Sequence, residues 1–235
     1  MFYCIAFVAV SIVFRIVFNF KVQGREYLTA YKTNGRPVVV CGNHLSMIDP
    51  VFVVMAYGVG KKMSIMGKAE LFRVPVLKTL LKWVGCFPVE RGTADNSALE
   101  KGIEDVKSGR GMMIFPEGTR GDRDEMQKVK SGAFVVARAT GADIVPVRLI
   151  FPNTNCKPRL FGKVVVKFGE PIKAEDMNLS SEDKRSLRVR RIKYKESMEN
   201  ILRRYCRETG YVPKMREIEK EKISPVEEYL FEVIL

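Results

Sequence analysis

Short apolar runs alternate with helical segments along most of this chain, and this alternation constrains its fold more than any other feature. Leu99, Ile103 and Val106, for example, share one face of a helix. Strands that alternate with helices favour an α/β fold built on one sheet. We expect strands at 21–28, 38–41, 61–65, 86–89, 111–115, 144–151 and 164–168, and helices at 50–57, 76–84, 97–108, 130–140 and 181–208. Asn34, Gly35 and Pro37 predict a turn at 29–36.

The net charge of the chain limits the classes of partner that it is expected to bind. It has 40 Lys and Arg against 27 Asp and Glu, a formal net charge of +13 over 235 residues. This excess favours nucleic acid, anionic lipid or an acidic carrier protein as partners. Basic and aromatic residues are not interleaved in an RNA-binding signature, so we expect no nucleic-acid partner. Five scattered cysteines and a single histidine argue against disulfides and against a metal site.

Residues 1–20 are apolar apart from three positions, of which Arg15 is the charged one. The stretch lacks the basic start and the small-residue cleavage site of a secretory signal. We expect a membrane-anchoring helix that either spans the bilayer or lies in one leaflet, with Arg15 near the interface. The basic residues that follow would place the main domain on the cytoplasmic face of the cell membrane. A buried core helix is the alternative.

The remaining chain divides into three segments. We expect the main domain at 21–172 and a basic amphipathic helix packed on it at 173–210. A peripheral tail follows at 211–235. The helix has an apolar stripe of Leu187, Tyr194, Met198, Ile201 and Tyr205. Its basic outer face fits a solvated surface at least as well as a functional one.

The single histidine, His44, lies between the apolar run 38–41 and the helix predicted to begin at Pro50 with Asp49 as its N-cap. Residues five apart on one helix lie roughly 140° apart around its axis and do not meet. The pair therefore forms only if 44–49 is a turn, in which Asp49 caps the helix, orients the imidazole, or does both. On spacing alone, a core histidine beside an ordinary N-cap is the better supported interpretation.

Polar clusters follow or lie within four of the expected strands. They are His44 with Asp49, Arg91, residues 117–120, and Arg148. Sites in open α/β sheets gather at strand ends, so we expect these clusters to converge. An imidazole oriented by a carboxylate suits proton abstraction, and arginines such as Arg91 and Arg120 bind phosphate through two forked donors. No serine lies in a nucleophile elbow, so the set favours acyl or phosphoryl transfer to a phosphorylated alcohol.

Four blocks of sequence, in order, resemble the motifs of the glycerolipid acyltransferase family. They are Asn-His-Leu-Ser-Met-Ile-Asp at 43–49, Gly-Cys-Phe-Pro-Val-Glu-Arg at 85–91, Phe-Pro-Glu-Gly-Thr-Arg at 115–120 and Val-Pro-Val at 145–147. The resemblance covers residues 20–170. It implies a single mixed β-sheet flanked by helices, with an N-terminal membrane-associated helix.

The resemblance also implies a reaction and roles for the residues. His44 would deprotonate the free hydroxyl of lysophosphatidic acid, with Asp49 as its orienter. The acyl thioester of acyl carrier protein or coenzyme A would supply the acyl group, without a further cofactor or metal, and the product would be phosphatidic acid. The acceptor-binding residues would be Lys68, Arg91, Glu117, Gly118, Thr119 and Arg120.

Two positions of the second block depart from its commoner form, namely Pro88 and Glu90, and they leave the choice of acceptor open. Another lysolipid or an ornithine lipid is the first alternative. A basic module that binds membrane or nucleic acid without catalysis is the second, but such a module has no need for His, Asp, Glu and Arg at successive strand ends.

Overall fold

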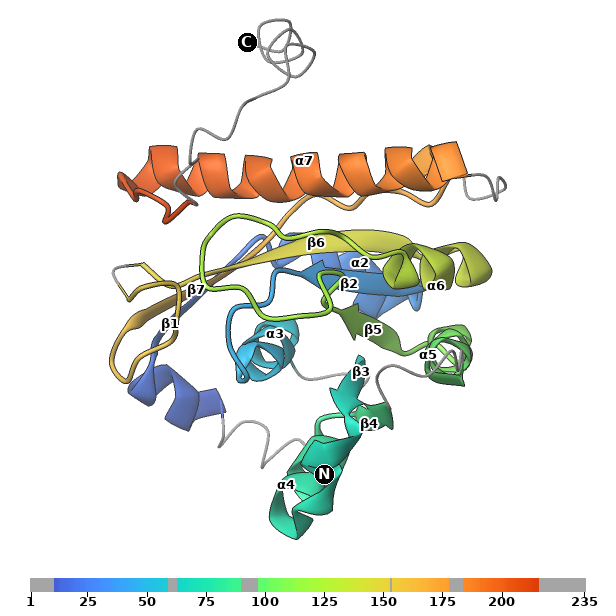
Figure 1. Ribbon diagram of the computed structural model, residues 1–235, viewed down its shortest axis with the longest axis horizontal. Helices are drawn as coiled ribbons and strands as arrows, with labels where there is room; N and C mark the ends of the chain where they lie inside the picture. The colour runs from blue at the N-terminus through green and yellow to red at the C-terminus, as the bar shows by residue number, and fades with distance from the viewer. Residues whose placement is uncertain (1–10, 59–62, 90–96, 153, 178–183, 216–235) are drawn as a thin grey trace, which may run out of the picture.

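The computed structural model of the chain describes residues 11–58, 63–89, 97–152, 154–177 and 184–215. Seven strands form one sheet in the order β1-β7-β6-β2-β5-β3-β4 (Figure 1). Strands β6 and β7 pair antiparallel, and every other neighbouring pair is parallel. The predicted single mixed sheet is therefore confirmed. The strands are β1 (Asn19–Gln23), β2 (Val38–Gly42), β3 (Met63–Lys68), β4 (Cys86–Val89), β5 (Gly111–Ile114), β6 (Asp143–Ile150) and β7 (Lys163–Phe168).

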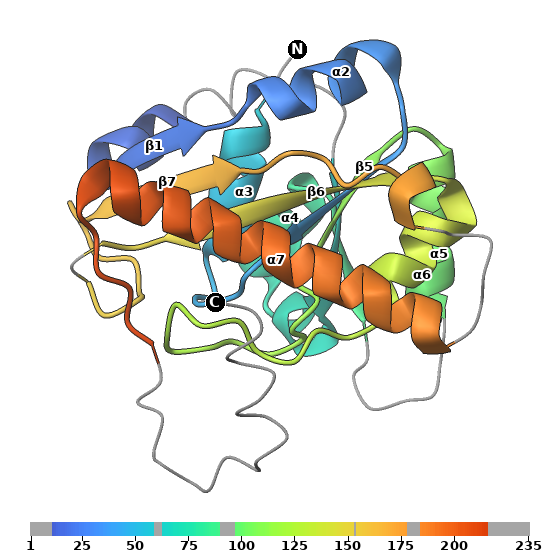
Figure 2. The same ribbon diagram turned by 90° about the horizontal axis from the view of Figure 1, so that it is seen from above.

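Helices cover both faces of the sheet, as Figures 1 and 2 show. Alternate residues of β2 separate the two cores: Val38 and Val40 pack on the side of α3, while Val39 and Cys41 pack on the side of α6 and α7. A central strand buried on both faces explains why this run is continuously apolar. The longer helices are α2 (Glu26–Asn34), α3 (Asp49–Tyr57), α4 (Pro75–Trp83), α5 (Ser97–Lys107), α6 (Gly132–Thr140) and α7 (Lys184–Thr209); short 3-10 helices span Ala69–Arg73 and Glu175–Met177.

The N-terminal segment differs from the predicted anchor. Residues 1–10 lie outside the described residues, and 11–17 are helical. Asn19 and Phe20 are not helical but pair with β7 in strand β1, so a helix over 1–20 extends too far. Phe14 packs on the core, with its ring 5.7 Å from that of Phe52. Within the part of the chain that the structure describes, no helix has the length and apolarity needed to cross a membrane.

The segment after β1 also corrects the sequence prediction. We expected a strand at 21–28 and a turn at 29–36, whereas the strand ends at Gln23 and α2 occupies most of the predicted turn. Leu28 and Tyr31, one helical turn apart, are both buried against the sheet. Tertiary burial of these two side chains outweighs the local turn chemistry, which ends the helix only at Gly35.

Helix α7 confirms the predicted basic helix. It lies along one face of the sheet (orange in Figures 1 and 2) and buries Tyr194, Met198 and Tyr205 from its apolar stripe. The chain after it does not leave the domain at once. Residues 211–214, which we assigned to a peripheral tail, lie against the loop that follows β5. Residues 216–235 of that tail lie outside the described residues.

Candidate active site

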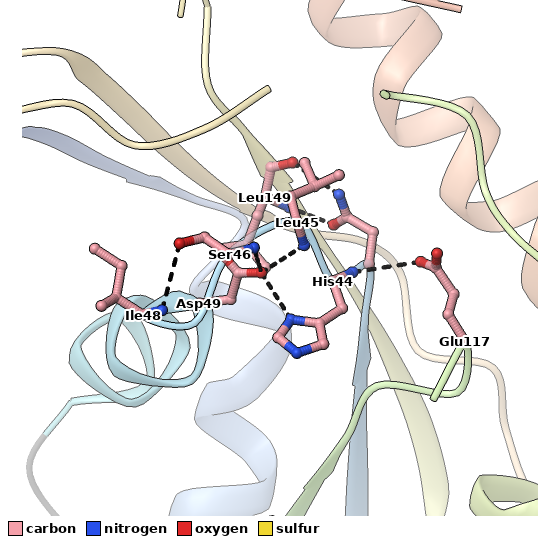
Figure 3. A network of polar contacts seen from close by, with 8 residues as sticks. His44, Leu45, Ser46, Ile48, Asp49, Glu117 and Leu149 are labelled. Carbon is pink, nitrogen blue, oxygen red and sulfur yellow. Dashed lines mark hydrogen bonds and ion pairs between the residues drawn. The ribbon is translucent and has the colours of Figure 1, made fainter. Parts of the chain in front are cut away.

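The turn between β2 and α3, residues 43–49, is called here the histidine turn (Figure 3). His44 Nδ1 lies 2.9 Å from Asp49 Oδ2, so the predicted contact is confirmed. The same oxygen accepts the backbone N–H groups of Leu45 and Ser46, each at 2.6 Å. Asp49 is fully buried, and three donors therefore hold its carboxylate in one orientation.

The predicted N-cap role of Asp49 is wrong. The cap position belongs to Ile48, which makes no side-chain cap, and Asp49 is the first residue of α3. Its carboxylate points back to the amides of the preceding turn, not forward to those of its own helix. A carboxylate at this position still lies at the positive end of the helix dipole, which favours its charge.

Two neighbours that sequence reasoning did not identify hold the histidine turn on the sheet. The side chain of Asn43 donates to the carbonyl of Leu149 at 3.0 Å and accepts the N–H of the same residue at 2.7 Å. The ring of Phe115 stacks on the imidazole of His44, with centroids 4.2 Å apart and planes 16° from parallel. Both residues are the first of a motif block, at 43–49 and 115–120, which was the signal available in the sequence.

This geometry selects one tautomer of His44. Asp49 as a carboxylate can only accept, so Nδ1 carries the proton and Nε2 presents a lone pair. Nε2 has no hydrogen-bond partner among the residues that the structure describes. No serine hydroxyl in that set bonds to the ring either: the hydroxyl of Ser46 accepts from Ile48 instead. With this tautomer, the turn can act as a base toward a proton that a substrate brings.

Glu117 reaches the histidine turn because β5 is the neighbour of β2 in the sheet. Its Oε1 accepts the backbone N–H of His44 at 3.4 Å and its Oε2 accepts that of Gln127 at 3.3 Å (Figure 3 shows the first). Burial raises the pKa of the Glu117 carboxyl, and these amides together with the charge of Arg148 oppose that rise. The carboxylate thus joins the turn to the loop after β5. Its contact with an acceptor stays a prediction.

Gly118 makes the sharp turn that follows. Its φ of +72° lies in the left-handed region, and a Cβ there would come within 2.6 Å of Lys130 Nζ. The turn leads into residues 119–128, called here the cavity loop. Thr119 and Arg120 at its start are exposed, and the Thr119 hydroxyl donates to Gln127 Oε1 at 3.0 Å.

The histidine turn and the cavity loop together line an open cavity of about 1180 Å³, and the N–H of Gly121 in the loop donates to the carbonyl of His44 at 2.7 Å. Leu45, Ser46 and Met47 line one wall and Arg120 the other. Four cations line it against two acids, so the space favours an anionic group. The cations are Arg120, Arg123, Lys128 and Lys157, and the acids are Asp122 and Glu125.

The other predicted site residues lie outside this cavity or outside the described residues. Lys68 ends β3, which β5 separates from β2, and its amine pairs with Glu70 at 3.0 Å. Arg91 lies outside the described residues. Arg148 is buried in β6 and donates through Nη2 to the backbone carbonyl of Asp124, so it lies beneath the cavity loop and not in its lining. No metal-binding group of three or more His, Cys, Asp or Glu side chains occurs in the described part of the chain.

Asp124 anchors the cavity loop from below, and no sequence signal marked it. Its Oδ2 accepts from the hydroxyl of Tyr211 at 2.6 Å and from the N–H of Lys214 at 2.8 Å. Its own N–H donates to the carbonyl of Lys214 at 2.8 Å. These bonds attach the segment after α7 to the wall of the cavity.

Several known proteins with similar sequences have the same activity in their names, and Lysophosphatidylcholine acyltransferase 1 of Danio rerio, 33% identical over 140 residues, is named for another acceptor. A 1-acyl-sn-glycerol-3-phosphate acyltransferase of Bacillus subtilis is 29% identical over 171 residues, which cover 72% of this chain and 81% of that protein. A chloroplast enzyme of the same name from Arabidopsis thaliana is 29% identical over 135 residues, and one from Borreliella burgdorferi is 32% identical over 120. Those two matches cover 57% and 50% of this chain, but only 36% and 46% of the relatives' own length.

A solved structure and a family model agree with these relatives. The crystal structure of the 1-acyl-sn-glycerophosphate acyltransferase PlsC from Thermotoga maritima matches with a TM-score of 0.56 at 25% identity, covering 78% of this chain and 72% of that one. The model of the Acyltransferase family matches residues 19–150, which contain the histidine turn and the cavity loop. That match spans more than half of the chain, and the chain therefore belongs to the acyltransferase family.

Proposed function

We propose that this protein transfers a fatty acyl group from an acyl thioester to the free hydroxyl of 1-acyl-glycerol-3-phosphate, which gives phosphatidic acid in phospholipid biosynthesis. The observation that carries the proposal is the His44–Asp49 pair, whose Nε2 has no serine or other hydrogen-bond partner among the described residues and whose turn lines a cationic cavity through Leu45, Ser46 and Met47. An enzyme that lacks its own activated hydroxyl has to use that of the acceptor. The names of the relatives supply the identity of that acceptor.

The step follows from the tautomer. Nε2 of His44 takes the hydroxyl proton while the acceptor oxygen attacks the thioester carbonyl. The tetrahedral adduct then collapses, the C–S bond breaks, and the imidazolium returns its proton to the departing thiolate. The buried Asp49 carboxylate, 2.9 Å from Nδ1, stabilises the imidazolium between these two transfers.

The cations of the cavity would hold the phosphate of the acceptor. Arg120 offers a fork of donors, and Thr119 and the backbone of Gly118 place it opposite the histidine turn. Lys68 and Arg91 remain predicted contributors from the neighbouring strands. The donor is acyl carrier protein or coenzyme A thioester, and the net charge of +13 suits either acidic donor as well as an anionic membrane surface. We place the protein at the cell membrane with its catalytic domain on the cytoplasmic face.

The test is direct product formation. Purified protein receives lysophosphatidic acid with labelled acyl-coenzyme A or labelled acyl carrier protein, and phosphatidic acid is quantified. We expect His44→Ala to lower turnover by about a hundredfold to ten-thousandfold, the usual contribution of a general base. Thr33→Ala, an exposed change on α2, is the control and should leave turnover unchanged.

Turnover retained in a folded His44→Ala variant would overturn the mechanism. If the parent protein acylates lysophosphatidylcholine or a lyso-ornithine lipid in preference to lysophosphatidic acid, the acceptor assignment fails while the acyl-transfer mechanism stands.

A further inference from the structure

The loop between β6 and β7 exposes two large apolar side chains at its tip. Leu160 is 69% exposed and Phe161 is 77% exposed. The base of the same loop is firmly held, because Cys156 is buried in the core and the hydroxyl of Thr154 donates to the carbonyl of Phe151. Leu160 and Phe161 therefore point away from the protein, on a loop whose base is fixed by packing and hydrogen bonds.

This tip is joined to the N-terminal helical segment. The N–H of Phe161 donates to the carbonyl of Val17 at 2.6 Å, and the N–H of Asn19 donates to the carbonyl of Gly162 at 3.1 Å. Both segments lie at the β1–β7 end of the sheet in Figures 1 and 2. Helical residues 11–17 turn Phe14 and Val17 toward the core and leave other apolar residues outside. We call the combined exposed set the apolar rim: Ile12, Val13, Ile16, Leu160 and Phe161.

The backbone holds Phe161 outward at a cost. Its φ of +60° lies in the left-handed region, which a bulky residue rarely adopts. The bond to Val17 and the neighbouring bond from the N–H of Gly162 to the carbonyl of Arg159 maintain this conformation. Asn or Gly would fit such a backbone better, so a phenylalanine here is not explained by the fold of the loop.

Cations surround the apolar rim. Arg15 and Lys21 are exposed on the N-terminal side, and Lys157 and Arg159 are exposed on the loop. Apolar side chains bordered by Lys and Arg are the pattern of a surface that enters the headgroup region of an anionic bilayer. Residues 1–10 continue the same apolar composition in the sequence.

We propose that the apolar rim inserts into an anionic lipid surface, so that the β6–β7 loop is a second insertion element beside the N-terminal segment. Lys157 of this loop also lines the cavity, so insertion of the tip places the cavity entrance at the level of the headgroups. A lysolipid then reaches the histidine turn without leaving the interface for water. This inference rests on the proposed function in one respect, namely that the acceptor is a lipid.

A fluorescent reporter at the tip tests insertion directly. Trp83 is the single tryptophan, so Phe161→Trp in a Trp83→Phe background reports on the tip alone. On addition of vesicles of phosphatidylglycerol and phosphatidylcholine, we expect the emission of this variant to shift to the blue and to be quenched by lipids brominated on the acyl chain. The matched control is Val189→Trp in the same background, at an exposed position on α7, and its emission should not change.

A partition experiment measures the contribution of the tip. Phe161→Asn suits the left-handed backbone and removes the apolar ring, so we expect vesicle partition in sedimentation to fall about tenfold or more. Val189→Asn should partition like the parent. Unchanged emission at position 161, or equal partition of Phe161→Asn and the parent, would overturn the proposal. Burial of the tryptophan by self-association without vesicles would assign the rim to a second copy and also overturn it.

These results are independent of the proposed reaction. Loss of turnover in His44→Ala together with an unshifted emission at position 161 would retain the reaction and reject the insertion. A shifted emission with no acyl transfer by the parent would do the reverse.

Discussion

The histidine turn and the cavity loop face each other across one cavity, but they are held in different ways. The imidazole in the turn is oriented by a local carboxylate: Asp49 binds His44, Leu45 and Ser46, all within five positions of it, while Leu149 and Glu117 bind the turn to the neighbouring strands. The cavity loop depends on distant partners, since Asp124 is held by Tyr211 and Lys214 from beyond α7. The orientation of His44 is therefore set by local contacts, whereas the cavity loop is positioned by the completed fold.

The largest expected effect comes from breaking the local network with Asp49→Asn. The neutral amide no longer stabilises the imidazolium or fixes its tautomer, so kcat should fall by about a hundredfold to ten-thousandfold. The amides of Leu45 and Ser46 lose a charged acceptor, and the free energy of unfolding should fall by about 1.5–3 kcal/mol. Kinetics and urea denaturation measure the two effects. Asp176→Asn, at an exposed carboxylate outside the cavity lining, is the control, and equal losses in both variants would contradict a special role for Asp49.

An intermediate effect should follow from Arg120→Ala on the opposite wall. Loss of a forked phosphate donor should raise the KM for lysophosphatidic acid by about tenfold to a hundredfold, while the unfolding transition stays the same. Arg123→Ala is the matched control, because that guanidinium also lines the cavity but lies 3.7 Å from Asp122. Equal increases in KM for the two variants would mean that the loop supplies only a general positive field.

The smallest effect should come from Tyr211→Phe, which removes one distant tie of the cavity loop. Burial and the Asp124 carboxylate raise the pKa of Tyr211, so its hydroxyl stays a donor throughout the usual assay range. Its removal should lower the free energy of unfolding by about 1 kcal/mol and raise the acceptor KM a few-fold, with kcat unchanged. Faster hydrogen exchange at 119–128 measures the loosened loop. Val212→Ala at an exposed neighbour should show none of these changes.

This difference between the walls also explains what the sequence predicted. The α/β class follows from local periodicity, whereas the mixed sheet and the pairing of His44 with Asp49 follow from the resemblance that the four short motif blocks carry. The N-cap prediction for Asp49 was wrong because it rested on the position of this residue before Pro50. In the structure the carboxylate accepts the amides of Leu45 and Ser46 instead. The amphipathic pattern of α2 is weak, so Asn34 and Gly35 dominated the prediction of a turn. The helix is stabilised by the burial of Leu28 and Tyr31 against the sheet, which the local sequence does not show.

The contacts that hold the cavity loop could not be predicted from local sequence patterns. Asp124 and Tyr211 are ordinary residues in their local sequence, and the return of the chain past α7 brings them together. Arg148 illustrates the limit well. It was expected at the site from its place in a strand, but the sheet buries it, and its guanidinium supports the loop from inside.

The placement of β1 has a consequence for the order of synthesis. Within the part of the chain that the structure describes, β1 pairs with β7 alone, through Asn19 with Lys163 and Phe20 with Val164. At ordinary translation rates its partner emerges from the ribosome on the order of ten seconds later. During that interval the apolar N-terminal segment has no edge to join, so it is free to meet a membrane first. Under the proposed insertion of this segment, the pairing of β1 with β7 would be completed at the lipid surface.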